Sequence, residues 1–214
     1  MSLTAKLQET KKAFSKNVPA DVQAIMSNAL NTLTAEGLPK TATKKGDLLT
    51  DATLVAIDGK EVNVHSFLKD GPLVVSFYRG GWCPYCNVEL KELQDALPQI
   101  KELGANLVAI TPETPDNSLT TSEKNNISFS VLSDIDNKYA KQLGLVFQMP
   151  EDLREVYHQF NIDVPKHNQN KDYELPLPAT YVVNIKGEIV LSFLPEDYTE
   201  RLDPVAIIDA LKSL

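Results

Sequence analysis

The two cysteines of the chain, Cys83 and Cys86, are its clearest candidates for chemistry. They are the only cysteines among 214 residues, and both lie in the tetrapeptide Cys83-Pro84-Tyr85-Cys86. Side chains three residues apart on a helix have Cβ atoms about 5–6 Å apart, and a disulfide needs Cα atoms about 4.4–6.8 Å apart. The spacing therefore predicts a pair that can interconvert between two thiols and one disulfide.

The place of this pair on its helix predicts unequal reactivity. Pro84 suits the first helical turn, because it has no N–H to leave unpaired and its φ is already helical. Cys83 then lies at the N-cap, beside free backbone N–H groups and the positive end of the helix dipole. Such a setting lowers the pKa of a thiol from about 8.5 to about 3.5–7.5. We expect Cys83 to be the exposed, activated sulfur and Cys86 to be its more buried partner.

Two other uses of the cysteines stay open, namely inert packing in the core and half of a zinc site. A structural zinc site needs about four ligands, and none of His65, His158 and His167 has ligand spacing with the cysteines. The spacing disfavours a metal site, and the expected chemistry needs no metal and no organic cofactor.

Composition restricts the class of protein. Apolar residues make up 43% and charged residues 23%, as in ordinary globular domains. The net charge of -8, without a basic stripe, disfavours a nucleic-acid partner. The longest apolar runs fall far short of the roughly 20 residues that cross a bilayer, and the N-terminus has no apolar signal region. Sparse cysteine usage disfavours a secreted disulfide scaffold. We therefore expect a soluble cytoplasmic protein that is not bound to membranes.

A strand and a helix are expected to hold the cysteines. The run 73–78 is continuously apolar, as in a strand buried on both faces, and Gly80-Gly81 follows it. A helix is predicted over 84–103, and Pro98 is expected to kink it or to end it early. Strands that alternate with helices predict an α/β fold. The other predicted elements are strands 52–57, 61–64, 106–110, 129–132, 179–185 and 188–193, and helices 118–125, 137–143, 151–160 and 204–211.

The N-terminal region has a different pattern. Residues 1–36 carry two apolar stripes at helical spacing and predict a helical N-terminal extension. Residues 37–46 are predicted to be a polar linker, and residues 47–214 the main domain. The two helices either pack on that domain or serve as a dimerisation arm, so a homodimer is possible.

Three segments of the chain resemble the alkyl hydroperoxide reductase/thiol-specific antioxidant family, and within it a peroxiredoxin-like branch with Cys-x-x-Cys. They are residues 77–87, 109–118 and 178–184. The resemblance implies a thioredoxin-like central sheet flanked by helices. The turn signal Asp58-Gly59 between strands 52–57 and 61–64 predicts an N-terminal β-hairpin ahead of it. The resemblance also implies an antioxidant thiol oxidoreductase, and it runs from roughly Lys45 to the C-terminus.

The resemblance further implies supporting residues and shows one departure. Pro178 looks like the cis-proline that lies against the Cys-x-x-Cys in the thioredoxin fold, with Pro176 as the competing assignment. The family motif is Pro-x-x-x-Thr-x-x-Cys. Counting without gaps places its attacking cysteine at Cys86, its threonine at Cys83 and its proline at Arg79. The later arginine of the family falls on Pro178, so the usual peroxide-binding set is incomplete.

Two neighbours of the cysteines, Arg79 and Trp82, keep alternative interpretations, and Tyr85 is a supporting residue of the motif. Arg79 either replaces the missing arginine electrostatically or is a surface arginine beside the site. Trp82 either shapes a docking surface for a partner or fills the turn as a half-buried wedge. Glu89 and Glu92 are expected to be solvated charges on the helix.

Two reactions fit the dithiol. In the first, one thiolate attacks a hydroperoxide and becomes a sulfenic acid, with which the other cysteine condenses. In the second, Cys83 attacks a substrate disulfide and Cys86 resolves the mixed disulfide. Both end in a Cys83–Cys86 disulfide that an external donor, such as thioredoxin or glutathione, would reduce. The resemblance favours the hydroperoxide, whereas the missing arginine favours disulfide exchange. A redox-sensing module that acts on the N-terminal arm is a third possibility.

Overall fold

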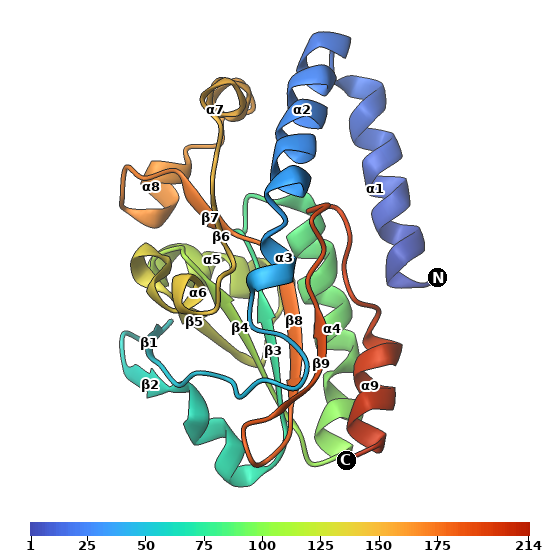
Figure 1. The fold of residues 1–214 in the computed structure, drawn as a ribbon, viewed down its shortest axis with the longest axis vertical. Coiled ribbons are helices and arrows are strands. Elements are labelled where there is room, and N and C mark those ends of the chain that lie inside the picture. The colour runs from blue at the N-terminus through green and yellow to red at the C-terminus, as the bar shows by residue number, and fades with distance from the viewer.

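The computed structural model describes residues 1–214 and has a seven-stranded sheet at its centre (Figure 1). The strand order is β2-β1-β5-β4-β3-β8-β9, in which β3, β4 and β5 are parallel and the other pairs are antiparallel. The strands are β1 Thr53–Ala56, β2 Glu61–Asn63, β3 Leu73–Phe77, β4 Asn106–Thr111, β5 Ser130–Ser133, β8 Ala179–Val183 and β9 Ile189–Phe193. The predicted α/β class and the β1–β2 hairpin are confirmed.

Helices cover both faces of this sheet, and a short second sheet lies beside it. The α-helices are α1 Leu3–Asn17, α2 Ala20–Glu36, α3 Leu38–Thr41, α4 Pro84–Glu102, α5 Pro115–Asn125, α6 Lys138–Gln142, α7 Glu151–Gln159, α8 Val164–Asn168 and α9 Pro204–Lys212. The 3-10 helices are η1 Val64–Asp70 and η2 Ile135–Asn137, and the second sheet pairs β6 Val146–Gln148 with β7 Glu174–Pro176. None of the helices combines the length and the apolarity that crossing a membrane requires.

Strand β3 forms the middle of the core, because it pairs with β4 on one side and with β8 on the other. All five of its residues are buried, as its continuous apolar run predicts. Alternate residues point to opposite faces of a sheet. Val74 therefore packs in the core beneath α4 and α9, whereas Val75 packs in the core beneath α6.

Helix α4 continues to Glu102, so the prediction that Pro98 ends it early is wrong. Pro98 is exposed, whereas Leu97 directly before it and Ile100 two residues after it are buried in the core. Packing of these two side chains holds the last turn, although the proline removes one helical hydrogen bond there.

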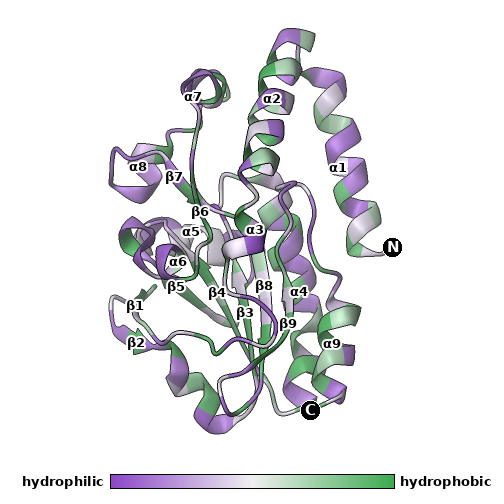
Figure 2. Cartoon of the chain, viewed as in Figure 1, coloured by the Kyte–Doolittle hydropathy of each residue, from purple (hydrophilic) through white to green (hydrophobic).

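The N-terminal helices form a hairpin that packs on the domain (Figure 1). Leu3 and Leu7 of α1 are buried in the core shared with α4, and the Lys6 ammonium pairs with the Glu92 carboxylate of α4. Helix α2 packs on α7. Both helices carry mixed hydrophobic and hydrophilic residues (Figure 2), as amphipathic helices do. The segment 37–46, predicted to be a polar linker, contains α3.

A substitution at Leu90 of α4 tests the packing beneath the cysteines. Its side chain is fully buried, so Leu90→Ala should lower the free energy of unfolding by about 2–5 kcal/mol through lost burial and a cavity. Leu119→Ala, at a position that is 39% exposed on α5, should change it by less than about 0.5 kcal/mol. Urea unfolding of the two variants measures the difference, and equal losses would contradict this packing.

Candidate active site

The turn between β3 and α4 is held tightly by contacts that require glycine. Gly80 has a φ of +155°, which side chains rarely adopt, and a Cβ on Gly81 would overlap the side chain of Thr121. The Gly81 N–H donates to a Glu113 carboxylate oxygen at 2.8 Å, and the Cys83 N–H donates to the Gly80 carbonyl at 3.1 Å. This turn places Cys83 at the N-cap of α4 with Pro84 at its first position, as predicted.

Both cysteines are free thiols with a relative exposure of 0%, so the prediction that Cys83 is exposed is wrong. The physical reason lies outside the motif. The Arg79 side chain folds back onto Cys83, and its guanidinium stacks on the Tyr198 ring, which comes from the loop before α9. Arg79, four residues before Cys83, and the distant Tyr198 therefore lie over an N-cap that an isolated helix would leave open.

Arg79 contacts Cys83 and is buried, so the alternative of a surface arginine is wrong. It is 3% exposed. Its Nη2 donates to the Cys83 Sγ at 3.0 Å and its Nη1 to the Tyr157 hydroxyl at 2.9 Å. The guanidinium carbon lies 4.2 Å from the centre of the Tyr198 ring and 5.2 Å from that of Trp82. A fixed positive charge therefore rests directly on the first sulfur of the pair.

Arg201 places a second positive charge on the other sulfur, and no sequence pattern predicted it. Its Nη2 donates to the Cys86 Sγ at 3.2 Å, and its Nε donates to the Glu89 carboxylate. Its side chain is 1% exposed. Arg201 is 115 residues from Cys86, and only the packing of the loop before α9 brings the two together. The site therefore contains a second arginine, although Pro178 occupies the position where the family pattern expected one.

Glu89 was expected to be solvated and is instead buried, with 1% exposure. Burial raises the pKa of its carboxyl to about 7, and the charge of Arg201 opposes that rise. Glu92 is partly buried and pairs with Lys6, so it too is not simply a solvated charge. Glu89, Arg201 and Cys86 form one connected buried group.

The two thiols differ in acidity. Burial acts to raise the pKa of Cys83, but a hydrogen bond from Cys86 and the charges of Arg79 and Arg201 outweigh it, so that pKa is lowered well below the ordinary value. For Cys86, burial and the neighbouring Cys83 thiolate raise the pKa well above the ordinary value. The environment therefore favours a thiolate at Cys83 and a thiol at Cys86.

The remaining predicted residues surround this pair in different ways. Tyr85 is buried, with its ring 5.9 Å from that of Tyr198. Trp82 is half-buried and packs edge-on against Tyr157 at 5.5 Å, which fits the interpretation as a wedge. Pro178 is buried and precedes Ala179, which pairs with the last residue of β3. The chain has no cis peptide bond, so the prediction of a cis-proline is wrong.

Glu113 is a further residue that the sequence did not single out. It is 1% exposed, and besides accepting from Gly81 it lies 2.9 Å from the His167 Nδ1. It therefore joins α8 to the turn that precedes the cysteines. No group of three or more His, Cys, Asp or Glu side chains is arranged to hold a metal ion.

A buried strand, a glycine turn and a helix that begins at a Cys-x-x-Cys define a dithiol protein of the thioredoxin-like class. Comparison with known families makes the assignment narrower. The model of the AhpC/TSA family matches residues 45–192, so the chain belongs to that family.

Curated relatives include bacterial and plant peroxiredoxins. Peroxiredoxin Bcp of Escherichia coli strain K12 is 29% identical over 102 residues, which cover 48% of this chain and 65% of that protein. The match thus spans just under two thirds of the length of that relative. The chloroplastic peroxiredoxin Q of Sedum lineare is 30% identical over 172 residues, which cover 78% of this chain and 79% of that protein.

Solved structures share the fold. The peroxidoxin BcpB from Mycobacterium tuberculosis has a TM-score of 0.63 at 19% identity, covering 80% of this chain and 98% of its own. Peroxiredoxin Q of Xanthomonas campestris has a TM-score of 0.58 at 17% identity, covering 76% and 90%. At these identities the likeness confirms the predicted thioredoxin-like sheet flanked by helices.

The raised pKa of Glu89 predicts a pH dependence of stability. The carboxyl titrates at about 4.3 when unfolded and at about 7 in the folded chain. The folded state therefore holds the extra proton between these values, and this term of the unfolding free energy falls as pH rises through that window. Glu89→Gln should remove a slope of up to about 1.4 kcal/mol per pH unit there. Urea unfolding at several pH values measures it.

The matched control for this prediction is Glu92→Gln, which makes the same substitution on the same helix. It should keep the slope of the unaltered chain, because Glu92 pairs with Lys6 and lies outside the buried group of Glu89, Arg201 and Cys86. The same slope in Glu89→Gln as in the unaltered chain would refute the raised pKa of the buried Glu89 carboxyl.

Proposed function

We propose that the chain is a thiol-dependent peroxidase that reduces hydroperoxides through a Cys83–Cys86 dithiol–disulfide cycle. The observation that carries the proposal is the placement of one buried guanidinium on each sulfur, Arg79 on Cys83 and Arg201 on Cys86. Cysteines that merely filled the core would not need buried cations. Membership of the AhpC/TSA family supports the same reaction class.

In the first step the Cys83 thiolate attacks the terminal oxygen of the hydroperoxide. An S–O bond forms as the O–O bond breaks, so that Cys83 becomes a sulfenic acid and the other fragment leaves as an alkoxide. The alkoxide takes a proton and departs as the alcohol, or as water when the substrate is hydrogen peroxide. Arg79 stabilises the thiolate before attack and offers N–H donors to the negative oxygen as it develops.

In the second step the Cys86 sulfur attacks the sulfenic sulfur of Cys83. The S–S bond forms, the S–OH bond breaks, and the hydroxide combines with the Cys86 proton as water. Arg201 stabilises Cys86 as it loses that proton. Glu89 is hydrogen-bonded to the same guanidinium, and its pKa of about 7 suits a group that accepts a proton at neutral pH.

The cycle closes when an external thiol donor returns two electrons to the disulfide. We propose a thioredoxin-type dithiol, with glutathione as the alternative, and a reducing compartment such as the cytoplasm. Because both sulfurs are buried, the donor can reach the disulfide only after the covering side chains have moved. The cycle as written uses no metal and no organic cofactor.

General disulfide exchange is the second candidate, and the Cys-x-x-Cys itself favours it. To form a mixed disulfide with a protein, the attacking sulfur must be exposed to that protein. A hydroperoxide needs access for only its two oxygens. The burial of Cys83 therefore favours the hydroperoxide.

Paired assays test the proposed function. Thioredoxin-coupled peroxide consumption should be far faster than with a free dithiol, and insulin-disulfide reduction should stay slow. Cys83→Ser should lower peroxide turnover on the order of 10³-fold or more, because the nucleophile is lost. Peroxide turnover no faster than with free dithiol would refute the peroxidase. The absence of multiple turnover in both assays would instead indicate a redox-sensing module.

Intact mass after peroxide treatment tests the order of attack. Cys86→Ser should gain one oxygen, because Cys83 forms a sulfenic acid that nothing resolves, whereas Cys83→Ser should not. The reverse result would assign the first attack to Cys86, the position that the gap-free family count indicates.

A further inference from the structure

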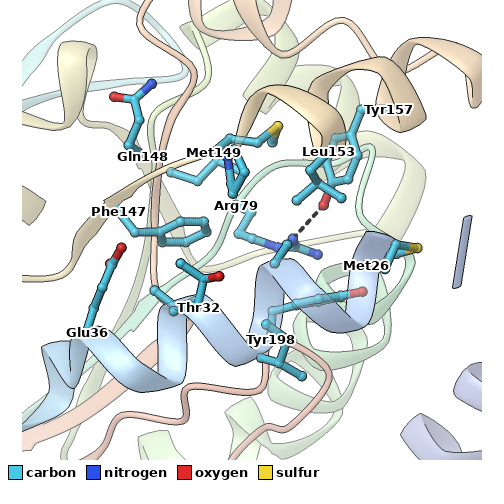
Figure 3. A pocket seen from close by; sticks show the side chains of 15 residues that line it. Met26, Thr32, Glu36, Arg79, Phe147, Gln148, Met149, Leu153, Tyr157 and Tyr198 are labelled. Atoms are coloured by element: carbon cyan, nitrogen blue, oxygen red, sulfur yellow. Dashed lines mark hydrogen bonds between the residues drawn. The ribbon is translucent and has the colours of Figure 1, made fainter. Parts of the chain in front are cut away.

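The Tyr157 hydroxyl lies beside the reacting sulfur, and neither step of the proposed cycle uses it. Arg79 donates from its Nη1 to this hydroxyl at 2.9 Å, the bond drawn in Figure 3, and from its Nη2 to the Cys83 Sγ at 3.0 Å. The fixed fork of a guanidinium makes groups on its two terminal nitrogens near neighbours. The phenol of Tyr157 and the sulfur of Cys83 are therefore two acceptors on one buried cation.

The hydrogen of this hydroxyl is free to be donated. A phenol is both a donor and an acceptor. The Tyr157 oxygen accepts from Arg79, and no hydrogen bond of the chain uses the Tyr157 O–H as a donor. The side chain is 5% exposed, and its ring packs edge-on against Trp82 at 5.5 Å. Burial raises the pKa of Tyr157, so the hydroxyl holds its proton at neutral pH.

Reduction of a hydroperoxide creates a need for such a proton. When the Cys83 thiolate attacks, negative charge passes from the sulfur to the leaving oxygen. A hydroxide or alkoxide leaves poorly unless it takes a proton as it departs, which is the task of a general acid. The Cys86 proton is used in the second step of the cycle, and burial of both sulfurs keeps bulk water from the first.

We propose that Tyr157 is the general acid of the peroxidase reaction and gives its hydroxyl proton to the oxygen that leaves when Cys83 attacks. This inference rests on the proposed function. The S–O bond forms, the O–O bond breaks, and the leaving oxygen takes the Tyr157 proton. The sulfur is oxidised to a sulfenic acid, the peroxide is reduced to an alcohol or water, and Tyr157 is left as a phenolate.

Arg79 stabilises that phenolate. A buried cation is costly without an anion beside it, and Cys83 stops being an anion when it becomes a sulfenic acid. The phenolate then balances the same guanidinium, on which its oxygen already lies. The Cys83 thiolate acts to raise the pKa of Tyr157, whereas Arg79 acts to lower it. Loss of the thiolate therefore makes the phenol more acidic at the moment when its proton is needed.

The proton returns when the disulfide is reduced. A dithiol donor brings two electrons and two protons. Cys86 keeps one proton as a thiol, whereas Cys83 is restored as a thiolate and leaves the other for the Tyr157 phenolate. Arg79 and Tyr157 both line a small cavity between α2 and α7 (Figure 3). Its free volume of about 30 Å³ has room for roughly one or two waters that can carry this proton.

No other tyrosine is placed for this role. Tyr198 presents the face of its ring to the guanidinium, with the Arg79 carbon 4.2 Å from the ring centre. Tyr85 packs edge-on against Tyr198. Among the tyrosines of the chain, only Tyr157 has its hydroxyl on an N–H of Arg79.

The dependence of the rate on the leaving group tests the proposal. The reduced chain is mixed with excess hydrogen peroxide, peroxybenzoic acid or iodoacetamide, and modification of the thiols is followed by intact mass. Hydroxide needs a proton as it leaves, whereas benzoate and iodide do not. Tyr157→Phe should therefore slow the reaction with hydrogen peroxide by about 100-fold, the low end of what general acids contribute. It should slow the other two reactions by less than about threefold.

The matched control is Tyr173→Phe, which removes a hydroxyl that lies on His158 rather than on Arg79. It should keep all three rates of the unaltered chain. A second measurement needs no variant. In D₂O, oxidation of the unaltered chain by hydrogen peroxide should be slower by roughly twofold, because a proton moves in that step, and oxidation by peroxybenzoic acid should not.

Two results would overturn the role of Tyr157, and they are distinguishable. Fast oxidation of the unaltered chain by hydrogen peroxide, with Tyr157→Phe slowing all three reactions equally or none of them, would refute the general acid and leave the peroxidase supported. Oxidation of the unaltered chain no faster than that of a free dithiol would refute the proposed function itself, and the role of Tyr157 with it.

Discussion

Two guanidinium groups buried against two sulfurs are the constraint that governs the site. Arg79 and Arg201 are both almost fully buried, and a buried cation is costly unless an anion and hydrogen bonds accompany it. Arg201 has the Glu89 carboxylate. The hydrogen-bond partners of Arg79 are a phenol and the Cys83 thiol. The anion that best balances the charge of Arg79 is therefore the Cys83 thiolate. The same thiolate is the reactive form of the cysteine.

The fold brings these two charges together from distant parts of the sequence. Arg79 follows β3 directly, so the strand and the glycine turn fix it together with Cys83. Arg201 arrives from the loop before α9, which packs against α4. Trp82 packs against both the core beneath α4 and the smaller core between α2 and α7. The dithiol thus lies near the place where the N-terminal extension packs on helices α4 and α7.

Local patterns predicted the elements that hold the cysteines. Each of these signals acts within a few residues: the apolar run of β3, the two glycines, and the proline after Cys83. The strand, the turn and the start of α4 lie where these signals predict them. Pro98 misled the prediction because tertiary packing outweighed its local cost. The three-residue strands β6 and β7 escaped notice because each is too short to show an alternating pattern.

The parts of the site that sequence missed depend on contacts between distant residues. No local signal indicates that a residue 115 positions away will lie on Cys86. Glu89 is different, because its spacing of three from Cys86 places both side chains on one face of α4. Leu90 and Leu93 extend that face into the core, and this signal was present in the sequence. The burial of Cys83 needed Tyr198, which only the folded chain brings near.

The measurement that tests the central claim most directly is a residue-resolved titration of the two thiols. NMR of the reduced chain labelled with ¹³C at cysteine Cβ reports the ionisation of each sulfur separately. The account predicts that Cys83 is a thiolate at neutral pH, while Cys86 stays protonated well above the pH at which an ordinary thiol ionises. A Cys83 that is protonated at neutral pH, or a Cys86 that ionises first, would contradict it.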